Sequence, residues 1–557
     1  MERQLSKLEQ TEYDLVVVGG GIFGICVAWD AVLRGLSVAL LERRDFAHGA
    51  SANCFKVVHG GIRYLQHADI IRTRESAAER RAFLRVAPHQ VSPLPILMPT
   101  YGHGMKGKEL LGAGMKVYDL VTADCNRGLR DPERRIPATR LLSRADTQAA
   151  LPQLEASNLT GGALFHDAQM YSPARLALCF LLAAAEQGVE AANYLEVTRL
   201  LRSGSRVCGV AARDTLSDRE LEVRGRMVVN ATGGWAPGLL ERSEAAAGLT
   251  PRPTFSRDAY FLVRRRISDG PGIAFPGQTS DPDAIFSRSA RHLFLMPWRD
   301  CTLVGVWHVV WEDEPDRAHV SERDLEAWLA ELNASLPGLD LRRDEVALTQ
   351  CGLVLFGENE PGAENLRYAH RSRIVDHARS DGMPGLLTLL GVRYTTARLD
   401  AARAVDQVCK HLGRRAARSD TANRPVYGGD IESVAELGRE AARVHPELGS
   451  GVLDALLRNH GSEYERVLAH GQLTPIPGTT TLAAEVLHAV REEMASKLSD
   501  VVFRRTDLGT AGSPGASALE AAADLMATEL GWERSRRDKE LEEVLAAYPA
   551  SAAEMSA

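Results

Sequence analysis

The chain has 557 residues, of which 45% are hydrophobic and 25% charged. This composition is typical of globular proteins and excludes a disordered, collagen-like or fibrous chain, and the length is sufficient for several domains. The net charge of −7 and the pI of about 6.2 exclude a globally basic surface of the kind that binds nucleic acid.

The chain opens with the pattern of a βαβ unit. A short β-branched strand is predicted over Tyr13–Val18, a glycine turn over Gly19–Gly24, a helix over Ile25–Arg34 and a second buried strand over Ser37–Glu42. A polar loop follows and leads into the segment HGGIRYL, which begins at His59.

The glycine turn has the GxGxxG spacing of a dinucleotide-binding site. Gly19 allows the tight turn, Gly21 lets the backbone approach a pyrophosphate, and Gly24 lets the helix and strand pack closely. The N–H groups at the start of the helix are expected to hold the phosphates. Glu42, at the end of the second strand, is expected to bind a ribose diol.

Further elements follow the periodicity and the capping signals of the sequence. The predicted elements are helices over Glu75–Val86, Ser172–Gln187, Ser321–Leu336 and Thr395–His411, strands over Arg226–Thr232 and Gly385–Leu390, and antiparallel strands between Ala259 and His308. After about residue 416 only helices are predicted, over Ile431–Val444, Gly451–Arg458, Leu482–Lys497, Ala516–Leu530 and Glu533–Ala547.

Two later glycine junctions favour FAD over NAD as the dinucleotide. The segment Ala231-Thr232-Gly233 follows a strand and resembles the second FAD motif of glutathione-reductase-like flavoproteins. A third junction runs from Gly391 to Thr395 and opens a late helix whose N-terminus would face a flavin. Three such junctions spread along the chain fit a discontinuous FAD domain better than a compact NAD domain.

The predicted fold class is α/β, with a Rossmann-like FAD-binding domain, an antiparallel-sheet substrate domain and an all-α C-terminal domain. The predicted boundaries are 13–85, 160–245 and 380–415 for the FAD-binding domain, 86–159 and 246–379 for the substrate domain, and 416–547 for the helical domain.

The cysteine pattern and the hydropathy indicate the cellular compartment in which the protein is expected. The eight Cys form no CxxC pair, so a disulfide framework and a zinc site are not expected, and no other metal-ligand spacing appears. No apolar run approaches the length of a membrane span, and the N-terminus is too polar for a signal peptide. We expect a cytoplasmic protein with reduced thiols, and peripheral contact with the inner face of the plasma membrane stays open.

Several stretches carry a resemblance to a known family. They are GGGIFGICVAWDAVLRGLSVALLERRDFAHGASANCFKVVHGGIRYL, HDAQMYSPARLAL, VVNATGGWAP, GVRYTTARLDA and LSDVVFRRTDLG. The chain resembles the FAD-dependent glycerol-3-phosphate dehydrogenases over nearly its whole length. The resemblance implies oxidation of sn-glycerol 3-phosphate to dihydroxyacetone phosphate, with hydride transfer from C2 to flavin N5. It further implies quinone as the electron acceptor (oxygen in the related oxidases), a membrane-surface location and a homodimer.

The resemblance also assigns roles to residues. His59 matches the active-site base, Arg63 its catalytic neighbour and Tyr64 a substrate contact, while Arg371 and Arg393 match substrate-binding cations. A base that titrates near neutrality suits His. For Lys56, contact with the cofactor and exposure to solvent are left as alternatives.

The chain departs from the family pattern at the expected phosphate site. Val354 occupies the place of a family Arg, and Arg393 replaces a Lys. Arg288 and Arg291 are candidates to compensate. The chain has 58 Arg and eight Lys, which reflects either coding bias or the use of some Arg as phosphate or carboxylate ligands.

Two alternative functions are kept open by these departures. The first is a flavin oxidase or dehydrogenase of another small anionic alcohol, 2-hydroxy acid or amine. The second is a flavin-binding protein without turnover, which acts in redox sensing or as an interaction module.

Overall fold

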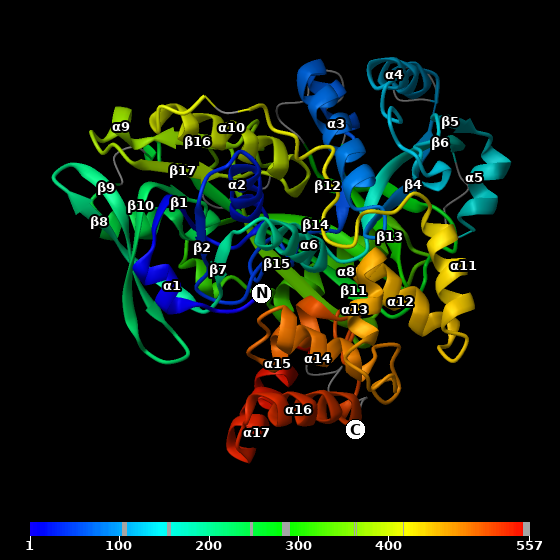
Figure 1. The fold of residues 1–557 in the computed structure, drawn as a ribbon. Helices are drawn as coiled ribbons and strands as arrows, with labels where there is room; N and C mark the ends of the chain where they lie inside the picture. Colours follow the sequence, from blue (N-terminus) through cyan, green and yellow to red (C-terminus); the bar gives the residue numbers. More distant parts are fainter. Residues whose placement is uncertain are drawn as a thin grey trace.

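The computed structural model describes residues 1–102, 108–152, 158–245, 249–280, 290–360, 363, 365–415 and 417–549. Two sheets and a set of C-terminal helices make up the molecule, and the last helices lie together at one end of it (Figure 1). The predicted α/β class, with a Rossmann-type sheet and a helical C-terminal region, is confirmed.

The first sheet has eight strands around a parallel centre. Its order is β16 (Arg373–Asp376), β17 (Leu386–Leu390), β10 (Glu220–Asn230), β1 (Glu12–Val18), β2 (Val38–Leu41) and β7 (Glu190–Ala192), and the hairpin of β8 (Leu195–Ser203) and β9 (Arg206–Asp214) extends β10. The strands from β17 to β7 run parallel, so their carboxyl ends meet at one edge. Ligands bind at this edge in open α/β sheets.

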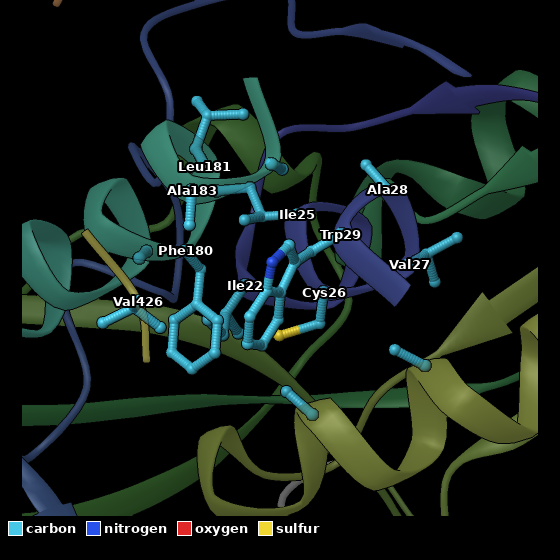
Figure 2. Close-up of a cluster of buried hydrophobic side chains, with 14 of the residues drawn as sticks. Ile22, Ile25, Cys26, Val27, Ala28, Trp29, Phe180, Leu181, Ala183 and Val426 are labelled. Carbon is cyan, nitrogen blue, oxygen red and sulfur yellow. The ribbon is translucent and has the colours of Figure 1, made fainter. Parts of the chain in front are cut away.

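Helices α2 (Ile22–Leu33), α6 (Pro173–Glu186) and α10 (Ala397–His411) form a buried layer with this sheet. α2 is hydrophobic all round because it is covered on all sides. The ring of Trp29 meets that of Phe180 edge to face, with centroids 5.1 Å apart, and Ile22 and Ile25 complete this contact (Figure 2). The packing fixes the glycine turn that precedes α2.

The second sheet has nine strands and is mainly antiparallel. Its order is β15 (Val346–Phe356), β11 (Thr254–Val263), β14 (Cys301–Trp311), β13 (Ala290–Trp298), β12 (Gly272–Ser280), β4 (Val91–Tyr101), β6 (Leu159–Met170) and β3 (Val57–Val58), and β5 (Arg140–Leu142) pairs with β6. Helix α8 (Glu322–Ser335) packs on this sheet through Leu325, Trp328 and Leu332. Ser321, the first residue of the predicted helix, is the N-cap of α8 and forms a capping box with Asp324.

The C-terminal region is helical. Its helices are α11 (Val434–Val444), α12 (Ser450–His460), α13 (Tyr464–Leu468), α14 (Ala483–Glu492), α15 (Leu498–Asp500), α16 (Ala516–Leu530) and α17 (Arg534–Leu545), with a π-helical turn over Val501–Arg505. Val486, Leu498 and Met526 share one hydrophobic cluster with Trp298 and Leu303 of the second sheet. The helices are therefore packed on this sheet, with α16 and α17 farthest from its centre (Figure 1).

The remaining helices precede the first strand or lie between successive strands. They are α1 (Leu5–Gln10), α3 (Ile70–Val86), α4 (Lys108–Val121), α5 (Arg144–Ala150), α7 (Ala236–Arg242) and α9 (His377–Ser380), with 3₁₀ turns over Ile62–His67, Pro132–Arg134, Gly233–Trp235, Pro315–Arg317, Arg343–Glu345, Tyr394–Thr396 and Gly461–Glu463. The charged sequence of α3 favours a surface helix, but Glu79 and Arg80 are buried. Glu79 accepts from Arg398 Nε at 2.9 Å, a partner that helical periodicity does not reveal.

Three strands lie outside their predicted domains. The predicted boundaries assign all of β6 but Leu159 to the FAD-binding segment 160–245 and β3 to the segment 13–85, but both strands belong to the second sheet. β16, placed in the substrate segment 246–379, pairs with β17 at the edge of the first sheet. The local pattern of a strand does not show which sheet it joins, because its partners are distant in sequence. The other boundaries stay predictions.

Candidate active site

A cavity of about 830 Å³ lies between the two sheets. One wall is formed at the carboxyl ends of four parallel strands, by Val18, Leu41, Ala231 and Leu389. The facing wall includes Val310 of β14 and Leu353 and Val354 of β15. The position at the carboxyl edge of a parallel sheet, and a volume within the usual range of ligand sites, indicate a cofactor cavity.

Most of the predicted cofactor-binding residues line this cavity. They are Gly19, Gly21, Glu42, Ala231, Thr232, Gly233 and Gly391. The other two do not line it: Gly24 lies behind the turn, and Thr395 Oγ1 accepts the His59 N–H at 3.1 Å. The structure therefore brings the three glycine junctions together although they span some 370 residues of the chain.

The glycine turn is shaped for close approach of a ligand. Gly19 has a φ of +105°, and a Cβ on Gly24 would lie 1.9 Å from the carbonyl oxygen of Gly19. A Cβ on Gly21 would meet only Ser51 Oγ, at 3.2 Å, so this residue offers bare backbone to the cavity. Gly21 is the N-cap of α2, where helix N–H groups attract phosphate. These residues fit the pyrophosphate of FAD.

Glu42 lies in the cavity wall and makes two backbone hydrogen bonds. Its Oε2 accepts the Gly20 N–H at 2.7 Å and its Oε1 accepts the Arg44 N–H at 2.9 Å. Burial raises the pKa of the Glu42 carboxyl, and these hydrogen bonds oppose the rise. The carboxylate is thus held at the end of β2, and its predicted contact with a ribose stays a prediction.

His59 is paired with an acid that the sequence predictions miss. The His59 side chain is half-exposed, and its Nδ1 lies 3.3 Å from Asp167 Oδ2 at the end of β6. Asp167 Oδ1 accepts the Gly60 N–H at 2.6 Å and Arg80 Nη1 at 3.2 Å. A Cβ on Gly60 would lie 2.2 Å from both Arg80 Nη1 and Tyr118 Oη, so a larger residue beside the His would displace these buried side chains.

The environment of Asp167 keeps it ionised. Burial opposes ionisation, but the hydrogen bond with His59, the charges of His59 and Arg80 and the Gly60 N–H together lower the pKa of the carboxyl. A carboxylate facing Nδ1 favours the tautomer with the proton on Nδ1, which leaves Nε2 as an acceptor. The sequence gives only a weak signal for this pair, the His-Asp dipeptide of the stretch HDAQMY, because nothing in that stretch predicts that β6 lies near His59.

A second pocket, of about 270 Å³, adjoins the cofactor cavity. It contains three of the predicted substrate residues, Tyr64, Arg371 and Arg393, and it shares Val392 and Arg393 with the cofactor cavity. The Arg393 guanidinium lies 4.8 Å from the centre of the Tyr64 ring. The pocket is rich in arginine and adjoins the cofactor cavity.

Arg63, the predicted catalytic neighbour of His59, lies outside both cavities. It lines neither of these two cavities, and its guanidinium lies 4.0 Å from the centre of the Tyr368 ring. Arg291 lies over the same ring at 4.4 Å. Arg288, the other candidate to compensate for Val354, lies outside the described residues, and Val354 itself presents an apolar side chain to the cofactor cavity.

Lys56 is buried, and the alternative of a solvent-exposed side chain is wrong. Its Nζ donates to Tyr260 Oη at 2.6 Å and to Gln350 Oε1 at 3.0 Å, and it lies 4.8 Å from the centre of the Trp298 ring. Burial lowers the pKa of the ammonium group to about 7. The residue does not line the cofactor cavity, although Cys54, two residues earlier, does.

A cluster of His and Glu residues in the C-terminal region has the proximity of a metal site. The sequence shows no metal-ligand spacing at these residues, yet the side chains of His460, His488 and Glu493 converge. Arg175 fills the space among them: its Nη1 donates to both Glu493 oxygens at 2.7 Å and its Nη2 to His460 Nδ1 at 3.0 Å. A buried guanidinium between the ligands makes this cluster an ion-pair network.

The comparisons with known proteins agree with this geometry. The chain matches the family of FAD dependent oxidoreductases over residues 14–398 and the C-terminal domain of alpha-glycerophosphate oxidase over residues 419–537. It is 29% identical to a glycerol-3-phosphate dehydrogenase of Synechocystis sp., with 97% of each chain covered. It is 30% identical to the mitochondrial glycerol-3-phosphate dehydrogenase of Homo sapiens, with 97% of this chain and 74% of the human chain covered.

A solved structure shows the same fold. The glycerol-3-phosphate dehydrogenase of Bacillus halodurans, crystallised with FAD, has a TM-score of 0.73 and 23% identity, with 98% of this chain and 97% of that chain covered. The match covers both the residues that line the cofactor cavity and the C-terminal helices. The chain therefore belongs to the FAD-dependent glycerol-3-phosphate dehydrogenase family of oxidoreductases, and its cofactor is FAD.

Proposed function

We propose that the protein oxidises sn-glycerol 3-phosphate to dihydroxyacetone phosphate. The observation that carries the proposal is the arginine-rich pocket beside the cofactor cavity, which is linked to the His59 loop because Thr395, two residues after Arg393 of the pocket, accepts the His59 N–H. The curated relatives are named glycerol-3-phosphate dehydrogenases, which gives the same substrate. This pocket is cationic although the chain departs from the family pattern at Val354 and Arg393.

The residues near the pocket divide the reaction between them. FAD, when bound, supplies the two-electron acceptor for a hydride from the carbinol carbon. Asp167 holds the His59 ring through Nδ1, and His59 Nε2 is left to take the hydroxyl proton. Asp167 then stabilises the imidazolium that forms. Arg371 and Arg393 attract the anionic end of the substrate.

An anaerobic titration tests the proposed substrate. The FAD-loaded protein, mixed with glycerol 3-phosphate without oxygen, is expected to lose its flavin absorbance near 450 nm in a saturable manner. Lactate, glycine and uncharged glycerol at the same concentrations serve as controls and are expected to leave the spectrum unchanged. Bleaching by a 2-hydroxy acid or an amine in place of glycerol 3-phosphate would identify another substrate class, and no bleaching by any of them would contradict turnover.

We further propose quinone as the electron acceptor, with the protein bound peripherally at the cytoplasmic face of the membrane. Among the described residues, no helix combines the length and apolar character needed to cross a bilayer. Four large aliphatic side chains that support peripheral contact are at least half exposed at the ends of α3 and α4: Ile70, Ile71, Val117 and Leu120. The homodimer implied by the resemblance stays a prediction.

These four residues lie on two neighbouring helix ends, and we propose that they form one apolar patch. Arg74 Nη1 of α3 donates to the Val121 carbonyl at 2.8 Å, so the start of α3 lies against the end of α4, and both helices stand at one end of the molecule (Figure 1). Exposed aliphatic side chains beside the cations Arg74 and Lys116 suit an anionic lipid surface. The patch adjoins the second pocket, because Arg72 of that pocket follows Ile71 in α3.

Sedimentation with vesicles tests the membrane contact. Vesicles that contain phosphatidylglycerol are expected to carry the wild type into the pellet and to leave the double variant Ile71→Glu/Leu120→Glu in the supernatant, because two charges oppose insertion. Val444→Glu, at an exposed aliphatic residue of α11, is the matched control and is expected to sediment like the wild type. Equal sedimentation of the double variant and the control would contradict this surface.

A further inference from the structure

We propose that Arg72 is a specificity-determining residue that binds the phosphate group of the substrate together with Arg371 and Arg393 in the second pocket. The inference rests on the proposed function and deepens it, since it names the group that recognises the dianionic end of a phosphorylated alcohol. Neither the glycine fingerprint nor the resemblance assigns a role to Arg72.

The first observation is an unpartnered donor. Arg72 stands in the first turn of α3, and it is 6% exposed. Its Nε is buried and has no hydrogen-bond partner among the described residues. Its Nη1 donates to His370 Nδ1 at 3.1 Å, and the nearest carboxylate oxygen, Asp69 Oδ2, is 3.7 Å from Nη1. A buried guanidinium of this kind lacks an anion at hydrogen-bond distance.

The second observation is the charge balance of the pocket. Two acids line it, Glu75 and Asp400, and both are bound by Arg403, at 2.5 Å and 3.3 Å. Asp400 Oδ2 also accepts the hydroxyls of Ser372 and Thr396, at 2.7 Å and 2.9 Å.

Once the acids are engaged with Arg403, three other guanidinium groups of the pocket have no carboxylate within hydrogen-bond distance in the described part of the chain: Arg72, Arg371 and Arg393. The pocket therefore carries an excess of positive charge.

The third observation is the arrangement around Tyr64. The guanidinium of Arg72 lies 4.2 Å from the centre of this ring and that of Arg393 lies 4.8 Å from it. Burial and the positive charge of Arg393 lower the pKa of Arg72, so the two cations destabilise each other when no anion is present. A phosphate dianion would remove this repulsion, and an Arg fork matches its oxygens better than a Lys does.

The pocket is placed to present such a substrate to the base. Arg393 borders both the pocket and the cofactor cavity. Thr395, two residues later, accepts the His59 N–H. On the other side, the backbone of Gly61 packs on Thr73, the residue after Arg72. The cation at Arg72 therefore lies on the helix that directly supports the His59 loop.

The experiment compares two arginine variants of the FAD-loaded enzyme. Arg72→Gln is expected to raise the Kd for glycerol 3-phosphate, measured by anaerobic flavin reduction, about 10- to 100-fold. The reduction rate at saturation is expected to change less than about threefold, because Arg72 does not hold the transferred proton. Arg72→Lys is expected to recover part of the affinity. Arg81→Gln, which removes an ion pair with Asp124 on the same helix, is the matched control.

A second readout separates this inference from the proposed substrate. Calorimetric titration of the same proteins with inorganic phosphate is expected to show binding to the wild type and to Arg81→Gln and none to Arg72→Gln. If glycerol 3-phosphate does not reduce the wild-type flavin, the proposed function fails, and the phosphate titration still decides the role of Arg72. Equal phosphate binding by Arg72→Gln and Arg81→Gln, with both proteins folded and yellow, would overturn the inference.

Discussion

Replacing His59 with Asn is expected to lower the rate of flavin reduction by glycerol 3-phosphate about 100- to 10,000-fold, the usual contribution of a general base. The amide keeps a donor toward Asp167 but has no nitrogen that can take the hydroxyl proton. Anaerobic stopped-flow measurement of the flavin absorbance gives this rate directly. The Kd for the substrate is expected to change little, because the anionic end is held by arginines in the neighbouring pocket.

Asp167 supplies the companion variant. Asp167→Asn keeps the size of the side chain but removes the charge that faces His59 Nδ1 and Arg80. Its reduction rate is expected to lie between those of His59→Asn and the wild type, since the base is present but less well oriented. FAD content and the visible spectrum are the controls for an intact cofactor site. A His59→Asn protein that reduces its flavin at the wild-type rate would exclude His59 as the base.

Replacing Asp45 with Ala is expected to lower the free energy of unfolding by about 3–5 kcal/mol, the typical effect of breaking a buried ion pair. Asp45 is fully buried and binds two cations of the C-terminal π-helical turn. Its Oδ2 accepts from Arg504 Nε at 2.5 Å, and its Oδ1 accepts from Arg505 Nη2 at 2.8 Å. Without the carboxylate, Arg505 is left with the carbonyl of Glu493 as its acceptor.

The unfolding midpoint in guanidinium chloride measures this effect. Asp313→Ala is the control, because its pair with Arg317 is exposed to solvent and adds little to stability. Equal unfolding midpoints for the two variants would show that the buried Asp45 cluster stabilises the protein no more than an exposed ion pair does.

Acidification gives a second test of Asp45. Burial opposes ionisation, but the charges of Arg505 and Arg504 hold the pKa of Asp45 far below its ordinary value near 3.9. The depressed pKa stabilises the fold above about pH 4, and this contribution is lost as the pH falls toward the folded-state pKa. The stability of Asp45→Ala is therefore expected to fall less than that of the wild type below about pH 4.

The parts of the fold that depend on local signals could be predicted from the sequence. The βαβ unit from Tyr13 to Glu42 could be predicted because its strand runs, glycine spacing and helix are contiguous. The helix after Ser172 has its own N-cap and a Pro at the first position, and it begins at the predicted residue. Such signals do not depend on what the element packs against.

The parts that were missed depend on contacts between distant residues. Asp167 reaches His59 across 108 positions, and Arg505 reaches Asp45 across 460. Lys56 and Arg80 carry charges that favour solvent, yet both are buried because partners from other elements enclose them. Arg63, which the resemblance assigns to the active site, contacts the Tyr368 ring and lines neither of the two pockets, and its catalytic role stays a prediction.

The Asp45 cluster has a consequence for the order in which the protein matures. Asp45 sits in the loop that supplies Arg43, Arg44 and His48 to the cofactor cavity, and its cationic partners follow it by 459 and 460 residues. During synthesis, this wall of the cavity therefore lacks its ionic partners until Arg505 has left the ribosome. We expect FAD to bind firmly only after the turn Val501–Arg505 has folded against this loop.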